Sequence, residues 1–120
     1  MSTTLLPVIQ PGATACCTPL TSEAMDAERA GGLAKKLKAL ADPTRLRLVS
    51  IVAASEGTEA CVCDLIEPVG LSQPTVSHHL KILMDAGFLT RSKRGTWAYY
   101  KLVPGALEEL SQLLDVTASR

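Results

Sequence analysis

Aromatic residues are scarce in this 120-residue chain, which contains one Phe, one Trp and two Tyr. The core must therefore be built from Leu, Val, Ile and Ala, and the hydrophobic fraction of 47% supplies enough of them. A chain of this length forms one domain with a high ratio of surface to volume. Such small domains often gain stability by dimerising, because dimerisation removes further apolar surface from water.

Export and membrane signals are also lacking. The N-terminal stretch MSTTLLPVIQPGATACC has neither a basic start nor a long apolar run, so we expect no signal peptide and no transmembrane span. We therefore place the protein in the cytoplasm. Its Thr, Pro and Gly content predicts a flexible arm over residues 1–20, ahead of a folded domain over residues 21–118. In a reducing compartment, paired cysteines more often bind metal or sense redox state than form structural disulfides.

The chain has no net charge, since it carries 12 basic and 12 acidic residues. This balance argues against a general polyanion binder, but the two signs are unevenly distributed. Residues 71–101 contain five basic residues and one acidic residue, a net charge of +4, whereas residues 55–70 contain four acidic and no basic residues, a net charge of −4. A basic segment in a neutral protein is typical of a directed phosphate-contacting surface, although ordinary solvated surface gives the same pattern.

Start and stop signals in the first half of the chain predict three helices. Thr21 or Ser22 is expected to cap a first helix that Gly31-Gly32 ends, and GLAKKLKALAD then forms a leucine-faced second helix. Asp42 as cap and Pro43 at the first helical position begin the third. Apolar residues cover most sides of that third helix, Leu46 among them, which predicts that it lies at the centre of the fold.

The second half predicts two helices, a β-hairpin and a last helix. A short helix containing CVCDL is expected to end at Pro68 and Gly70, and Ser72 is expected to cap the next helix. Two β-prone runs, 88–92 and 96–102, flank SKRG and predict the hairpin. The segment PGALEELSQLLDV places leucines on one face of the final helix.

Two short helices joined by EPVGLS and followed by a basic hairpin predict a mainly α winged helix-turn-helix with about five to six helices and a two-stranded β wing. Gln can address adenine bidentately, Ser and Thr reach bases or phosphates, and Lys pairs with phosphate or guanine. Exposed helix faces are usually polar, so the basic hairpin is the feature that favours DNA binding. The candidate DNA contacts are Ser72, Gln73, Thr75, Ser77, His78, Lys81, Arg91, Lys93 and Arg94.

The stretches LADPTRLRLV, CVCDL and LSQPTVSHHLK occur here in the order and spacing of the ArsR/SmtB family of bacterial metal-responsive repressors. The chain resembles this family from about Leu33 to the last helix. The resemblance implies a homodimeric winged-helix protein that binds a palindromic operator in double-stranded DNA and is released by metal. It also implies dimer contacts from the helix near 21–30 and the helix 104–116.

The resemblance bears on the cysteines as well. Family members that sense arsenite or antimonite carry a further thiol one turn after the CVC pair, and here that position is Ile66. The missing ligand is then implied to come from the arm, either within one subunit or across the dimer. The implied metal ligands are Cys16, Cys17, Cys61 and Cys63.

The sequence does not decide how many of the cysteine sulfur atoms bind one ion. On a regular helix, positions i and i+2 point about 200° apart, so Cys61 and Cys63 can face one ion only if Cys61 is extended or caps the helix. A three-sulfur site suits As(III) or Sb(III) as inducer, which we favour, and a four-sulfur site suits Cd(II), Pb(II) or Zn(II). Thiol redox sensing is a further alternative, and cysteines that serve only as small buried hydrophobic residues are another.

Other chemistries have less support. Zinc sensors of this family use His and carboxylates on the last helix, and that spacing is absent here, so His78 and His79 are expected to contact DNA or pack. An enzyme is not expected, because the sequence contains neither a C-x-x-C motif in a βαβ pattern nor a nucleophile–base constellation. DNA binding is expected to need no cofactor.

Overall fold

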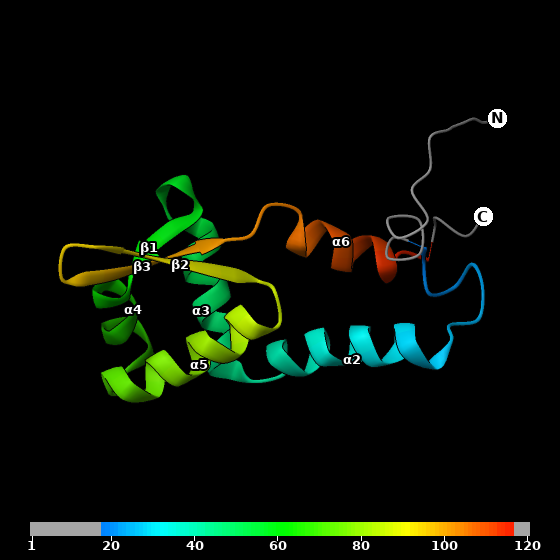
Figure 1. Ribbon diagram of the computed structural model, residues 1–120, viewed down its shortest axis with the longest axis horizontal. Coiled ribbons are helices and arrows are strands. Elements are labelled where there is room, and N and C mark those ends of the chain that lie inside the picture. Colours follow the sequence, from blue (N-terminus) through cyan, green and yellow to red (C-terminus); the bar gives the residue numbers. More distant parts are fainter. Residues whose placement is uncertain (1–17, 117–120) are drawn as a thin grey trace. The chain divides into compact units, whose positions relative to one another are not determined.

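The structure is a computed structural model that describes residues 18–116 (Figure 1). These residues fall into two compact units, one formed by Gly31–Ala106 and the other by residues 18–30 and 107–116. The elements are α2 (Ala27–Leu40), α3 (Pro43–Ala54), the 3-10 helix η2 (Glu56–Thr58), β1 (Glu59–Cys61), α4 (Val62–Val69), α5 (Gln73–Asp85), β2 (Leu89–Arg94), β3 (Trp97–Leu102) and α6 (Ala106–Leu113).

The core of the Gly31–Ala106 unit is aliphatic, as the composition predicts, apart from the buried rings of Phe88 and Tyr100. In Figure 1, α4 and α5 lie below the three strands, and α3 contacts α4, α5 and β3. The central position expected for α3 is therefore confirmed, but Leu46 is 53% exposed and does not belong to the core. The largest fully buried side chains are Phe88, Leu48, Leu65, Leu80, Leu83, Val52 and Val76.

The sheet contains a strand that the sequence does not predict. The order is β1-β3-β2, and both pairs are antiparallel. Glu59 lies opposite Lys101 and Cys61 lies opposite Tyr99, so β1 occupies an edge of β3 that a two-stranded hairpin would leave unpaired. Three residues are too few to show the alternating pattern by which strands are recognised. The last residue of β1 is Cys61, one of the predicted metal ligands.

The β2–β3 turn is tighter than expected. Arg94 pairs with Trp97, so the turn consists of Gly95 and Thr96 alone, and the SKRG segment is mostly strand. Gly95 has φ +65°, a value that Gly adopts at no steric cost in a two-residue hairpin turn. Lys93 and Arg94 are therefore successive strand residues and point to opposite faces of the ribbon.

The predicted helix break at Gly31-Gly32 is wrong, because α2 continues through both residues. Gly in a helix interior costs about 1 kcal/mol relative to Ala, which weakens a helix without ending it. The predicted start is also wrong: Thr21 and Ser22 lie in a turn. The side chain of Asp26 caps α2 instead, since its carboxylate accepts a hydrogen bond from the Arg29 N–H at 2.8 Å.

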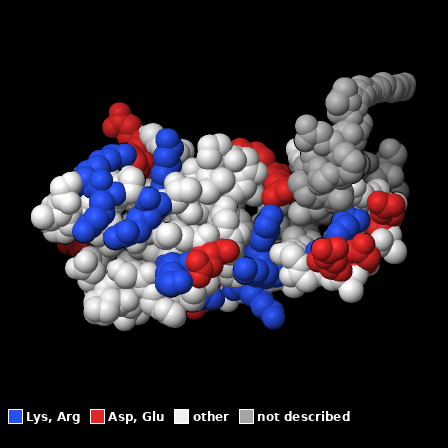
Figure 2. Space-filling model, viewed as in Figure 1, with Lys and Arg blue, Asp and Glu red and all other residues white. Residues whose placement is uncertain are grey.

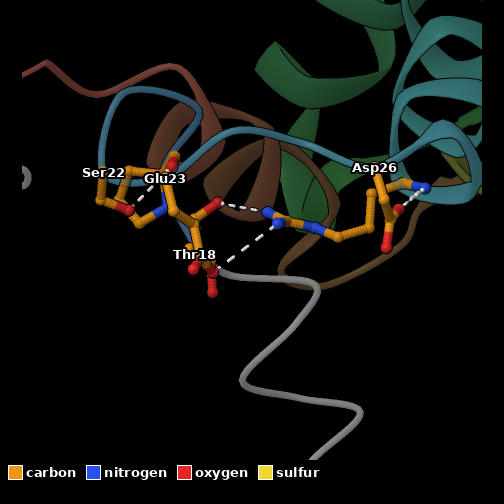
Figure 3. Close-up of polar contacts among 6 residues, drawn as sticks. Thr18, Ser22, Glu23 and Asp26 are labelled. Atoms are coloured by element: carbon orange, nitrogen blue, oxygen red, sulfur yellow. Dashed lines mark hydrogen bonds and ion pairs between the residues drawn. The ribbon is translucent and has the colours of Figure 1, made fainter.

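The side chain of Arg29 contacts two residues that precede α2, Thr18 and Glu23, both labelled in Figure 3. Its Nη2 donates to the Thr18 carbonyl at 2.9 Å, and its Nη1 lies 3.9 Å from the Glu23 carboxylate. In the same unit the Leu20 N–H donates to the Leu113 carbonyl at 2.7 Å, near the end of α6. These contacts tie Thr18, Leu20 and Glu23 to the rest of the unit. Cys16 and Cys17 lie outside the described residues.

Candidate nucleic-acid interface and thiol pair

The start of α5 is capped by Ser72, as predicted. Ser72 has an extended backbone, and its Oγ accepts a hydrogen bond from the Thr75 N–H at 3.4 Å. The two hydroxyl oxygens lie 3.0 Å apart, so Ser72 and Thr75 are also hydrogen-bonded to each other. Pro74 falls in the first turn, where its missing N–H is tolerated. The two hydroxyls therefore stabilise the helix start, while the neighbouring Gln73 is exposed.

The outward face of α5 is polar and accessible, as the helical spacing predicts. His78 and Lys81 are exposed, and Ser77 is half-buried. The Lys81 ammonium lies 3.1 Å from the Asp85 carboxylate, with side chains that are 72% and 59% exposed. An ion pair this exposed contributes little, so Lys81 can exchange Asp85 for a phosphate at small cost.

His79 faces the protein rather than solvent. Its Nδ1 lies 3.2 Å from Nη1 of Arg45, whose Nε donates to the Ala39 carbonyl at 2.6 Å. Asp42, the predicted cap of α3, accepts a hydrogen bond from the Arg45 N–H at 3.1 Å, and this bond is the main reason why the pKa of Asp42 is lowered. His79 thus connects α5 to the junction of α2 and α3, in agreement with the packing role considered for it.

The wing residues differ in their surroundings. The Nη2 of Arg94 lies 2.5 Å from the Glu59 carboxylate, and its guanidinium stacks 4.5 Å from the centre of the Tyr99 ring. Arg91 and Lys93 are exposed, and neither has an ion pair within residues 18–116. Figure 2 shows Lys and Arg side chains gathered over the β2–β3 ribbon. Of the three basic residues predicted to contact DNA here, only Arg94 is already held by an acid, a contact that sequence reasoning missed because it joins residues 35 apart.

The thiol pair lies where β1 becomes α4. Cys61 has an extended backbone (φ −72°, ψ 144°), and its sulfur caps α4 by accepting a hydrogen bond from the Cys63 N–H at 3.2 Å. The two Cα atoms are 5.2 Å apart and the side chains form a disulfide. Cys61 is 4% exposed, whereas Cys63 is accessible. The geometry is therefore the one in which both sulfurs face a common point, because Cys61 caps the helix instead of lying within it.

The pair has no further metal-binding neighbours in the described part of the chain. No group of three or more His, Cys, Asp or Glu residues is positioned there to hold a metal ion. One turn after Cys63, the half-buried Ile66 supplies no ligand atom. None of the helices within residues 18–116 has the length and apolarity needed to cross a membrane.

Comparison with known proteins accounts for this combination of a helix-turn-helix unit and a basic wing. Residues 42–91 match the family described as bacterial regulatory protein, arsR family. The chain is 44% identical over 81 residues to the arsenical resistance operon repressor of Bacillus subtilis, covering 68% of this chain and 72% of the relative. It is 42% identical over 82 residues to an uncharacterized HTH-type transcriptional regulator of Methanocaldococcus jannaschii, covering 68% of this chain and 90% of that relative.

The chain belongs to the arsR family of bacterial regulatory proteins. A solved structure described as a possible transcriptional regulator for arsenical resistance superposes on this ArsR-family protein with a TM-score of 0.59 and 35% identity, covering 66% of this chain and 79% of the other. The predicted winged helix-turn-helix fold is confirmed. The protein is a DNA-binding transcriptional repressor and not an enzyme.

In this ArsR-family repressor, the predicted DNA contacts all belong to the Gly31–Ala106 unit, on α5 with its cap and on β2. Their contacts with DNA stay predictions. Of the four predicted thiol ligands, Cys61 and Cys63 are adjacent, and the other two precede Thr18 in the sequence.

Proposed function

We propose that this repressor binds a palindromic operator as a homodimer in the cytoplasm and releases it when As(III) or Sb(III) binds cysteine thiolates. The observation that carries the proposal is the convergence of Cys61 and Cys63 at the start of α4. In the dithiol form, an extended residue 61 allows both sulfurs to approach one soft ion. A helix N-terminus also favours negative charge, and thiolates are the ligating form. Relatives named as arsenical resistance repressors support the inducer class.

The remaining ligands are assigned to the arm. A trigonal site needs one sulfur more than the pair provides, and Cys16 and Cys17 are the other thiols in the chain. Thr18, the residue after Cys17, is anchored by Arg29, so the arm has a defined point of attachment. A site that recruits all four thiolates would suit Cd(II) or Pb(II), which is the alternative inducer class.

The proposed release acts through β1 as well as α4. Cys61 lies opposite Tyr99 in the β1–β3 ladder, and Glu59, two residues before it, holds Arg94 of the wing. An ion that draws Cys61 out of this ladder therefore disturbs the wing and the cap of α4 together. An inducer acts only through its different affinities for free and DNA-bound repressor, and a coupling of about 1–3 kcal/mol, or roughly 5–150-fold in operator affinity, is typical.

Homodimerisation is supported by where apolar side chains remain exposed. Four of the large ones lie in or next to the segments expected to form the dimer contacts, or further along α2, which begins in the first of these segments. They are Leu20, Leu37, Leu114 and Val116. Burial in a symmetric interface would remove them from water, and a two-fold axis would match a palindrome. Light scattering at micromolar concentration is expected to report a dimer, and a monomer would refute this part of the proposal.

The test of inducer binding is an arsenite titration of the protein on a fluorescently labelled operator. Wild-type protein is expected to dissociate, whereas the Cys16→Ser/Cys17→Ser double variant is expected to bind DNA normally and stay bound. Cys61→Ser and Cys63→Ser are matched variants within the pair, and they are expected to differ in severity because one sulfur is buried and caps α4. Normal release from the double variant would refute the role of the arm.

The Cys61–Cys63 disulfide favours a second candidate, a thiol redox sensor. In this reaction the pair loses two electrons and two protons to a peroxide, which is reduced to water as the S–S bond forms. The same double variant separates the candidates. A redox sensor would lose or gain operator affinity on peroxide treatment whether or not Cys16 and Cys17 are present, and it would not respond to arsenite under reducing conditions.

A further inference from the structure

Trp97 is the one indole of the chain and stands at the tip of the wing. It is the first residue of β3, directly after the Gly95-Thr96 turn, and it is 50% exposed. Trp has a large apolar surface that is well covered in most folded proteins, so half exposure at a projecting turn leaves apolar area that a binding partner would remove from water at a gain. The position calls for an explanation beyond the stability of the unit.

The chemistry around Trp97 restricts that partner. The β2–β3 ribbon, residues 89–102, contains four basic and no acidic residues. Arg94 lies directly opposite Trp97, so the guanidinium and the indole share one face of the ribbon, whereas Lys93 pairs with Ala98 and belongs to the other face. A partner that covers Trp97 therefore lies beside basic groups on both faces, Lys93 without an ion pair in the described residues and Arg94 paired with Glu59, and negative charge beside its apolar surface would complement them.

The sugar–phosphate backbone of DNA has this composition, because apolar deoxyribose faces alternate with phosphates along each strand. We propose that Trp97 is a DNA contact, its indole packing against deoxyribose while Lys93 and Arg94 approach the flanking phosphates. This contact rests on the proposed binding of operator DNA. It adds to the affinity for DNA a contribution that is apolar rather than ionic. The Gly95-Thr96 turn, which has no large side chain, lets the ribbon tip come close to the backbone.

The two kinds of contact respond differently to salt. Each Lys or Arg that neutralises a phosphate releases counterions and steepens the dependence of affinity on salt concentration. Burial of an indole against a sugar releases none. Loss of the Trp97 contact should therefore weaken binding by the same factor at every salt concentration, and loss of a basic wing residue should lower the salt slope by about one.

The first measurement uses the fluorescence of Trp97 in the wild-type protein, with a duplex that the protein selects from a random-sequence library. Binding of the labelled duplex is followed separately by anisotropy. Acrylamide is expected to quench the indole readily in free protein and much less in the complex. Equal quenching in both states would overturn the proposed contact while leaving DNA binding intact, whereas failure to bind any duplex would overturn the proposed function as well.

The second measurement compares three variants. Trp97→Thr, which keeps a strand-forming residue, is expected to bind roughly tenfold more weakly with an unchanged salt slope, and Trp97→Phe is expected to recover part of the loss. Lys93→Ala is the matched control on the same ribbon and should flatten the salt slope. Urea unfolding verifies that each variant folds. A Trp97→Thr protein with wild-type affinity would overturn the proposal.

Discussion

The helices α4 and α5 pack against the same core but present opposite chemistry to solvent. Leu65 of α4 and Leu80 of α5 are both completely buried. On their outer surfaces α4 exposes Asp64 and Glu67, whereas α5 exposes Gln73, His78 and Lys81. If the proposed DNA contacts hold, the acidic segment 55–70 would be turned away from DNA and the basic segment 71–101 toward it, because phosphates repel the first and attract the second. Burial in the shared core explains the apolar residues on the inner faces of both helices, and the difference in charge distinguishes their outer faces.

The two helices also begin differently. A hydroxyl, that of Ser72, caps α5, and a sulfur, that of Cys61, caps α4. Sulfur is a weak hydrogen-bond acceptor but a strong ligand for soft ions, so a thiophilic ion competes for the cap of α4 and leaves that of α5 unaffected. This contrast matches the two proposed roles, inducer response at the start of α4 and DNA reading by α5.

The largest effects are expected where the two helices are alike. Leu65→Ala and Leu80→Ala should each lower the free energy of unfolding by about 2–5 kcal/mol, because each leaves a cavity in the shared core. Leu46→Ala, at an exposed position of α3, is the control and should cost less than about 1 kcal/mol. Urea unfolding at one fixed protein concentration measures all three. A Leu65→Ala loss as small as that of Leu46→Ala would show that α4 is not part of the core.

Intermediate effects are expected on the DNA-reading side. Gln73→Ala removes a side chain placed to address a base edge, and should change which operator sequences are preferred, by about 1–3 kcal/mol at the affected base pair. Lys93→Ala should instead weaken binding to all sequences alike, because phosphates carry no sequence information. Competition binding on a panel of single-base operator variants measures both.

Asp64→Asn on α4 is the control for this experiment. It removes one acidic charge from the surface proposed to face away from DNA and should leave sequence preference unchanged. The assignment of roles would be wrong if Lys93→Ala altered the preferred sequence and Gln73→Ala did not.

Much of the helix-turn-helix could be predicted because its signals are local. Asp42 with Pro43 and Ser72 with Pro74 start helices within a few residues of themselves, and Gly70 ends α4 with a left-handed backbone (φ +70°). The basic residues of the wing could also be recognised from the sequence, because they lie within a few residues of one another. The local signals that combine a cap with a proline or a left-handed glycine are therefore confirmed, whereas the single local signals at Ser22 and Gly31 are not.

Features that depend on distant contacts were missed or left open. The strand β1 exists because Cys61 and its neighbours pair with β3, about 40 residues away. That pairing, in turn, holds residue 61 extended and decides that both sulfurs converge, a question that helical spacing alone could not answer. The continuity of α2 through Gly31-Gly32 is likewise a case in which a weak local preference was overruled.

The smallest effect concerns pH and contrasts the charged cap of α3 with the neutral cap of α5. The pKa of Asp42 is lowered, chiefly by the hydrogen bond that its carboxylate accepts from the Arg45 N–H. A folded-state pKa below the unfolded value means that the stabilisation is complete above the unfolded pKa and is lost as pH falls through the folded one, over the acidic interval below the usual Asp pKa. Asp42→Asn keeps an acceptor oxygen but does not titrate, so its unfolding midpoint should fall less than that of wild type across this interval. Ser72→Ala should lower the midpoint equally at every pH, because a hydroxyl cap has no charge to lose. Parallel pH profiles for wild type and Asp42→Asn would show that the carboxylate charge does not stabilise α3.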